Sequence, residues 1–256
     1  MEFIGDPKTR IEEDYLRSLR FFRFFAWYGV GRPDRDGLRA VVQTKAGLDT
    51  LSVERVWSEF KRLLQARTPE RAVLWMRTTE VLNAVLPENW GLDQFHWLIN
   101  AETENNWSPD PIQRLQAMLR PAEDVMTAVA DRLKFSNDER ERLLDWTEEA
   151  SKAGGYVELA VVDFAKVLYR GKKDAIRDGL VHEYAKRFNK EEAGADRILA
   201  LLDFMKTWER PEFPVSGEDL IKTGLTPGPD LGNKLKALEE EWIESGFTLS
   251  RGDLLS

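Results

Sequence analysis

Apolar residues recur along most of the chain with the spacing of an α-helix rather than that of a β-strand. The first such series consists of Ile11, Tyr15, Leu19, Phe22 and Ala26. It predicts one N-terminal helix, which we expect Gly29 and Gly31 to end. Alternating Val, Ile and Thr runs of the kind that form strands are scarce. The pattern therefore predicts an all-α fold.

Capping residues and prolines mark where further helices should begin. Ser52 is placed to cap a helix at 53–64, Pro69 to open one that runs to about residue 85, and Asp110 to cap one at 111–119. Ser136 is followed three residues later by Glu139, which is a capping box leading into a helix at 140–152. The remaining expected helices are 92–101, 121–133, 157–169, 174–187, 191–208 and 231–244.

Two segments differ from this regular pattern. The stretch 157–169 is the most apolar, and we expect it to be the most buried helix. Prolines and glycines crowd together from Pro211 to Gly232, which indicates a boundary near 208–214 and a small, turn-rich C-terminal part. Within it, Gly224–Gly232 is either a phosphate-binding turn or an ordinary corner between two helices, and two prolines without N–H groups weaken the first alternative.

Composition narrows the function classes. Hydrophobic residues make up 42% of the chain and charged residues 32%, which is typical of a globular protein, and we expect no membrane partner. The formal net charge of -8 argues against binding of nucleic acid through bulk charge, although a local basic surface remains compatible with it. No cysteine is present, which excludes thiolate chemistry and fits a cytoplasmic location.

One charged pattern stands out on the first predicted helix. Arg17, Arg20 and Arg23 follow one another at intervals of three residues, and Asp14 precedes the first by the same interval. Residues three apart are neighbours on a helix surface, so these groups should form one row. An Asp–Arg pair offers acceptors and forked donors that can match the edge of a nucleobase, and the next arginines can hold phosphates. The alternative is a solvated face on which Glu13 and Asp14 pair with the arginines.

Other candidates for catalysis are weaker. His96 lies between two aromatic residues, and His182 next to Glu183 is no stronger as a catalytic base. Nucleophile, P-loop and zinc-protease motifs are absent from the sequence. We therefore assign no catalytic residue and no metal ligand.

Several segments resemble a known family. The N-terminal stretch 3–24, which contains Glu13-Asp14-x-x-Arg17, is similar to the start of the neck of class II tRNA nucleotidyltransferases, the CCA-adding enzymes and bacterial poly(A) polymerases. Residues 51–59 resemble the helix that closes this neck, and 214–232 resemble the tail. The resemblance implies three serial helical parts: a neck at 1–67, a body at 68–208 and a small Gly/Pro-rich tail at 209–256.

The resemblance also implies a function. Asp14 and Arg17 would pair with the base of CTP or ATP, Glu13 would hold Arg17, and Arg20 and Arg23 would line the nucleotide pocket. Body and tail would bind tRNA, and no DNA partner is expected. Residues 8–23 fit this role, because five basic and three acidic residues give them a local net charge of +2.

The family's catalytic head, in which a Gly-Ser or Gly-Gly turn precedes a metal-binding Asp-x-Asp, is not found in this sequence. Mg²⁺ would be bound by that head, because phosphoryl transfer depends on metal ions. We therefore expect this chain alone to add no nucleotides. The activity that the resemblance implies for the whole enzyme is nucleotidyl transfer to tRNA 3′ ends. A separate head chain is a candidate partner. The alternative function is that of a stand-alone RNA-binding helical module without catalysis. The sequence does not distinguish whether the whole enzyme adds CCA, A alone or poly(A).

Overall fold

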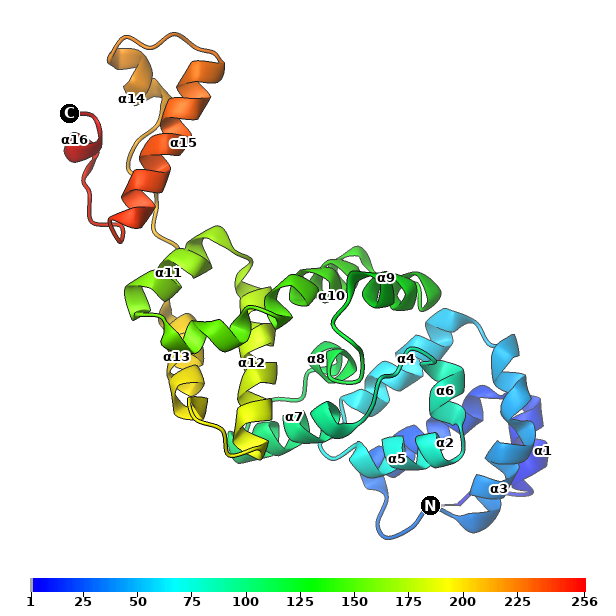
Figure 1. The fold of residues 1–256 in the computed structure, drawn as a ribbon. Helices are drawn as coiled ribbons and strands as arrows, with labels where there is room; N and C mark the ends of the chain where they lie inside the picture. Colours follow the sequence, from blue (N-terminus) through cyan, green and yellow to red (C-terminus); the bar gives the residue numbers. More distant parts are fainter. Residues whose placement is uncertain (1) are drawn as a thin grey trace.

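The computed structural model describes residues 2–256, which form an elongated series of helices (Figure 1). Within this range the chain is 69% helical and has no sheet, which confirms the all-α prediction. The N-terminal helices are α1 (Pro7–Glu13), α2 (Leu16–Tyr28), α3 (Arg35–Thr44), η1 (Lys45–Thr50), α4 (Val53–Leu64), α5 (Glu70–Thr78) and α6 (Val81–Val85). The central ones are α7 (Asp93–Glu104), α8 (Pro111–Gln116), α9 (Glu123–Arg132), α10 (Asn137–Ala150), η2 (Ala153–Glu158), α11 (Val161–Arg170), α12 (Lys173–Asn189) and α13 (Ala195–Thr207). The C-terminal ones are α14 (Gly217–Lys222), α15 (Pro229–Glu244) and α16 (Arg251–Leu254).

The prediction of one continuous N-terminal helix is wrong, because the chain breaks between α1 and α2. Asp14 is extended, with φ −156° and ψ 102°, and therefore ends α1. Its Oδ1 then accepts a hydrogen bond from the Leu16 N–H at 3.2 Å, at the start of α2. Asp14 thus lies at the junction of two helices rather than inside one.

Two other predicted helices also differ. The helix expected from Pro69 to residue 85 is divided into α5 and α6 at Glu80, which has a left-handed φ of 60°. The apolar stretch 157–169 is not one buried helix, because α11 begins only at Val161. Val161 and Val162 are 43% and 47% exposed, so this part of the stretch is not in the core.

The local capping predictions are largely confirmed. Ser136 and Glu139 form a complete capping box at α10, and Ser216 and Asp219 form one at α14. Asp110 caps α8 by accepting the N–H of Ile112 at 2.9 Å. Ser52 is the N-cap residue of α4, as expected, but its side chain makes no capping hydrogen bond.

One hydrophobic cluster runs from Ile11 to Met205 and joins α1 through α13. Helix α12 is central to it and packs against α7, α10 and α13. Buried charged groups also lie within this region. The Arg114 side chain is 1% exposed and pairs with Glu102 at 2.5 Å, whereas Asp178 is fully buried and accepts hydrogen bonds from Arg142 and Gln113.

A second, smaller cluster holds the C-terminal helices together, and Figure 1 shows them set apart from the rest, at the opposite end from the N-terminus. Its apolar side chains include Val215, Leu238 and Trp242. Tyr169 of α11 joins this cluster, and its hydroxyl donates to Glu239 of α15 at 2.6 Å. The 224–232 segment forms the corner between α14 and α15, which pack against each other.

No helix within residues 2–256 combines the length and the apolar character that crossing a membrane requires.

Candidate functional site

A cavity of about 320 Å³ lies against α1 and α2. Three of its lining residues are arginines: Arg10, Arg17 and Arg20. The others are Glu2, Phe3, Ile4, Phe21 and Phe24. Guanidinium groups beside aromatic rings suit a ligand that combines a negative charge with a flat, apolar part.

Glu13 positions the first two of these arginines. Its Oε2 accepts from Arg10 Nη1 at 2.6 Å and from Arg17 Nη1 at 2.5 Å. Arg17 Nη1 also donates to the carbonyl oxygen of Arg10 at 2.6 Å, so its head is fixed at the C-terminal end of α1. The hydrogen bond from Arg17 lowers the pKa of Glu13 below its ordinary value, which keeps this carboxylate charged.

Asp14 points to different partners. Its carboxylate accepts from Arg55 Nη2 of α4 at 3.2 and 3.3 Å, and its Oδ2 lies 3.8 Å from Arg20 Nη1. The Arg17 N–H donates to the Asp14 carbonyl at 2.9 Å, but no hydrogen bond joins the two side chains in the part of the chain described here. The predicted Asp–Arg side-chain pair is therefore not formed in the folded chain.

Glu59 is the residue that the sequence reasoning missed. This α4 side chain is only 6% exposed, and its two oxygens accept from Arg20 Nε at 3.3 Å and Arg23 Nε at 2.7 Å. Charge-assisted hydrogen bonds of this kind are roughly twice as strong as neutral ones. The similarity of residues 51–59 to the family was the available signal, but it assigned no role to Glu59.

The structure therefore brings the five predicted residues together only in part. Arg17 and Arg20 line the cavity, and Glu13 holds Arg17. Arg23 is 19% exposed, shares Glu59 with Arg20, and stacks its guanidinium 4.2 Å from the ring centroid of Phe24. The ion pairs of the solvated-face alternative are present as well, since Glu13 pairs with Arg17 and Asp14 with Arg20.

The site has an excess of positive charge. Five arginines share three carboxylates: Arg10, Arg17, Arg20, Arg23 and Arg55 share Glu13, Asp14 and Glu59. An anion that enters the cavity can therefore meet guanidinium groups that are not fully neutralised.

The other candidates found in the sequence lie outside this site. His96 is exposed, and burial lowers the pKa of His182 to about 4. Across residues 2–256, no three histidine or acidic side chains come together in a way that fits a metal ion.

Residues 33–91 match the family described as the probable RNA and SrmB-binding site of polymerase A. Over its whole length the chain is 29% identical to the mitochondrial CCA tRNA nucleotidyltransferase 1 of Mus musculus, of which it covers 57%. It is 25% identical to a CCA-adding enzyme of Leuconostoc mesenteroides, with 99% of this chain and 59% of the relative covered. The chain thus spans less than two thirds of the length of these relatives.

The fold is similar to that of solved CCA-adding enzymes. The enzyme of Bacillus stearothermophilus in complex with CTP has a TM-score of 0.68 and 20% identity, with 95% of this chain and 60% of that one covered. The enzyme of Thermotoga maritima in complex with tRNA has a TM-score of 0.65 and 16% identity, with 97% and 61% covered. At this level of identity the likeness concerns the fold.

Proposed function

We propose, from the premise that this chain is a CCA-adding-enzyme-like C-terminal portion, that it binds tRNA and holds the CTP or ATP to be joined to the tRNA 3′ end. The single observation that carries the proposal is the cavity beside α1 and α2, where Arg10, Arg17 and Arg20 lie next to aromatic rings. A nucleoside triphosphate needs both features, because its phosphates are anionic and its base is flat.

Within this proposal each residue has a role. Asp14 and Arg17 contact the edge of the base, and Glu13 keeps Arg17 in place. Arg20 contributes positive charge to the cavity, and Arg23 supports it through the shared carboxylate of Glu59. Arg55 restrains Asp14 from α4 until a base competes for the carboxylate.

The helices beyond α4 bind the tRNA in this proposal. The match of residues 33–91 to an RNA-binding family supports RNA binding by the region from α3 to α6, and the fold shared with an enzyme solved with tRNA supports the extension to the later helices. We also propose the division into neck (1–67), body (68–208) and tail (209–256). The separate hydrophobic cluster of the C-terminal helices supports the second boundary.

Nucleotidyl transfer itself would involve Mg²⁺, which supports the attacking hydroxyl and the leaving pyrophosphate. We propose that Mg²⁺ is held by a head portion of the kind that makes up the rest of the relatives' length, on the same or on a separate chain. For the compartment we propose the cytoplasm, based on the lack of cysteine, although the mouse relative is mitochondrial by name.

Equilibrium binding of the four nucleoside triphosphates tests the proposal that this chain holds CTP or ATP. We expect CTP and ATP to bind more tightly than GTP and UTP. We expect Arg17→Ala to weaken CTP binding at least tenfold, because Arg17 both lines the cavity and faces the base. Arg120→Ala is the matched control, since Arg120 pairs only with Asp124 on the surface. Equal binding of all four nucleotides, or no effect of Arg17→Ala, would refute the nucleotide role.

Extension of tRNA separates this function from that of an RNA-binding module without catalysis. The chain is mixed with a separately produced head portion of a relative, and incorporation of labelled CMP and AMP at the tRNA 3′ end is followed. Incorporation that depends on Arg17 supports the proposal. Salt-sensitive tRNA binding with no nucleotide preference and no incorporation indicates the module instead.

A further inference from the structure

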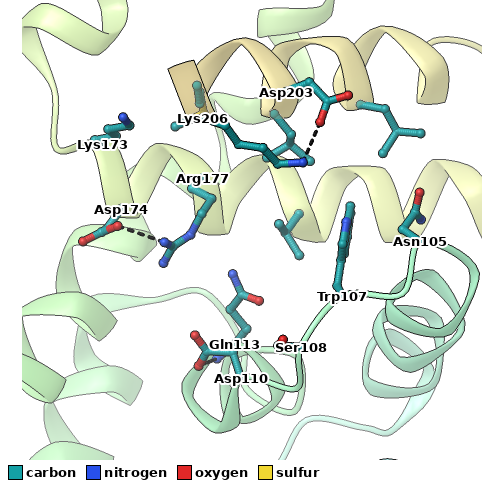
Figure 2. A pocket seen from close by; sticks show the side chains of 14 residues that line it. Asn105, Trp107, Ser108, Asp110, Gln113, Lys173, Asp174, Arg177, Asp203 and Lys206 are labelled. Carbon is teal, nitrogen blue, oxygen red and sulfur yellow. Dashed lines mark hydrogen bonds and ion pairs between the residues drawn. The ribbon is translucent and has the colours of Figure 1, made fainter. Parts of the chain in front are cut away.

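A larger cavity, of about 560 Å³, lies between α12, α13 and the loop that joins α7 to α8 (Figure 2), and no residue of α1 or α2 is among its lining residues. Its floor is apolar and comes from α12 and α13, and the ring of Trp107 forms one wall. Lys173, Arg177 and Lys206 also line it. Neither the nucleotide cavity nor any motif of the sequence analysis accounts for this arrangement.

Trp107 is held rigidly. Asn106 has a left-handed φ of 51°, and the Trp107 N–H donates to the Glu102 carbonyl at 2.8 Å, which is the C-terminal capping pattern of the Schellman type. The Glu102 side chain is itself clamped by the buried ion pair with Arg114. Asn105 ties the same loop to the hydroxyl of Tyr184 at 3.0 Å. These contacts fix the backbone of Trp107, and its indole ring packs against the ring of Tyr184, with the centroids 5.4 Å apart.

The side-chain oxygen of Gln113, Oε1, is a hydrogen-bond acceptor that no group of the described chain uses. Its side chain lines the cavity, although the residue is only 8% exposed. Its Nε2 donates to Asp178 Oδ1 at 2.7 Å, which fixes the orientation of the amide. No group in residues 2–256 donates to Gln113 Oε1. Because the residue lines the cavity, an N–H group of a ligand can reach this oxygen and pair with it in place of water.

Three cations complete the cavity. Figure 2 shows Lys206 paired with Asp203 and Arg177 paired with Asp174, at 2.7 and 3.0 Å. In each pair the two residues are three positions apart on the same helix. Both pairs are partly exposed, because the side chain of Lys206 is 69% and that of Arg177 42% exposed. Such pairs contribute about 0–1 kcal/mol, so a phosphate can compete with Asp203 for Lys206 and with Asp174 for Arg177. Arg177 also donates to the buried Asp178 at 3.2 Å, which holds its guanidinium beside the cavity.

We propose that this cavity binds one unpaired nucleotide. The base stacks on Trp107, an N–H of the base donates to Gln113 Oε1, and the phosphate is held by Lys173, Arg177 and Lys206. Stacking on an aromatic ring next to basic groups is the general mode by which unpaired nucleotides are bound. A peptide with an apolar side chain would use the floor but neither the acceptor nor the cations. The inference rests on the proposed RNA-binding function and adds a second nucleotide site to it.

Titration with AMP tests the cavity, in the Arg17→Ala background so that the first site does not contribute. We expect Trp107→Ala to weaken AMP binding at least tenfold and Trp107→Phe to restore most of it. Trp90→Ala is the control, because Trp90 is 71% exposed and lies outside this cavity. The double variant Lys173→Ala/Lys206→Ala should weaken binding several-fold, and Lys134→Ala should not. Adenosine and ribose 5-phosphate, which each lack one half of the ligand, should both bind more weakly than AMP.

Labelled tRNA then distinguishes the source of the nucleotide. If Trp107→Ala weakens tRNA binding as well, the site takes a nucleotide of the RNA. If only AMP binding falls, the site takes a free nucleotide, and the cavity assignment still holds. Equal AMP binding by Trp107→Ala and Trp90→Ala, or competition by an apolar peptide but not by AMP, would overturn the proposal. If only the cavity beside α1 and α2 is wrongly assigned, the Arg17→Ala variant will bind CTP as tightly as the unsubstituted chain does.

Discussion

Replacing Glu59 with glutamine removes the negative charge that α4 presents to two arginines of α2. In the folded chain each oxygen of this buried carboxylate accepts one guanidinium Nε, at 3.3 Å from Arg20 and 2.7 Å from Arg23. A glutamine keeps one acceptor, but its NH₂ group faces a donor, so one bond is lost and the other then runs from a guanidinium to a neutral oxygen. Arg20 and Arg23 are 40% and 19% exposed and can in part return to water.

The expected cost follows from these contacts. A hydrogen bond to a charged group contributes about 1.5–3 kcal/mol, and the longer bond to Arg20 belongs at or below the lower end. Since the arginines regain hydration, we expect Glu59→Gln to reduce the free energy of unfolding by about 2 kcal/mol. For a chain of this size that corresponds to a fall in melting temperature of about 4–8 °C. CTP binding should weaken too, because Arg20 lines the cavity.

Thermal unfolding followed by circular dichroism, together with CTP titration below the melting range, measures both effects. Glu54→Gln is the control, since Glu54 is exposed on the same helix. If Glu59→Gln melts and binds CTP as the control does, then Glu59 does not organise α2 and the reasoning fails.

Three further predictions concern stability. Asp178→Ala removes a fully buried carboxylate that pairs with an arginine and should cost about 3–5 kcal/mol in urea unfolding; a loss below about 1 kcal/mol would contradict this. His182 has a folded pKa of about 4, below the ordinary 6.5, so the unfolded chain binds more protons between these pH values and stability falls as pH is lowered from 6.5 to 4. His182→Gln should reduce this slope in unfolding experiments at several pH values, and an unchanged slope would contradict the prediction. Gly47→Ala should lower the melting temperature, because an added Cβ would overlap the ring of Tyr15; an unchanged melting temperature would show that this contact relaxes freely.

The features that sequence alone predicted correctly are those with local causes. Ser136 and Glu139 form their capping box within three residues of each other, so the pattern contains all that the cap needs. The break at Asp14 could not be predicted in this way, because the apolar spacing continues through Tyr15. It depends on the Asp14 side chain, which accepts the Leu16 N–H and is also held by Arg55 of another helix.

Ion pairs between residues far apart in the chain, and the burial of apolar residues, could not be predicted from local sequence patterns either. Glu59 is 36 residues from Arg23, and no local spacing relates the two. Apolar composition also did not equal burial, since Val161 and Val162 lie on an exposed side of α11. The positions of Arg17 and Arg20 beside the cavity agree with the sequence-based hypothesis, whereas their roles toward a nucleotide stay a prediction.

The sharing of Glu13, Asp14 and Glu59 among the arginines has a consequence for how this region can change. Because each carboxylate serves two guanidinium groups, a substitution at one arginine alters the environment of the next. Double substitutions here should depart from the sum of the single ones. We therefore expect a replacement at one of these positions to be tolerated best when a second replacement at a partner position compensates for it.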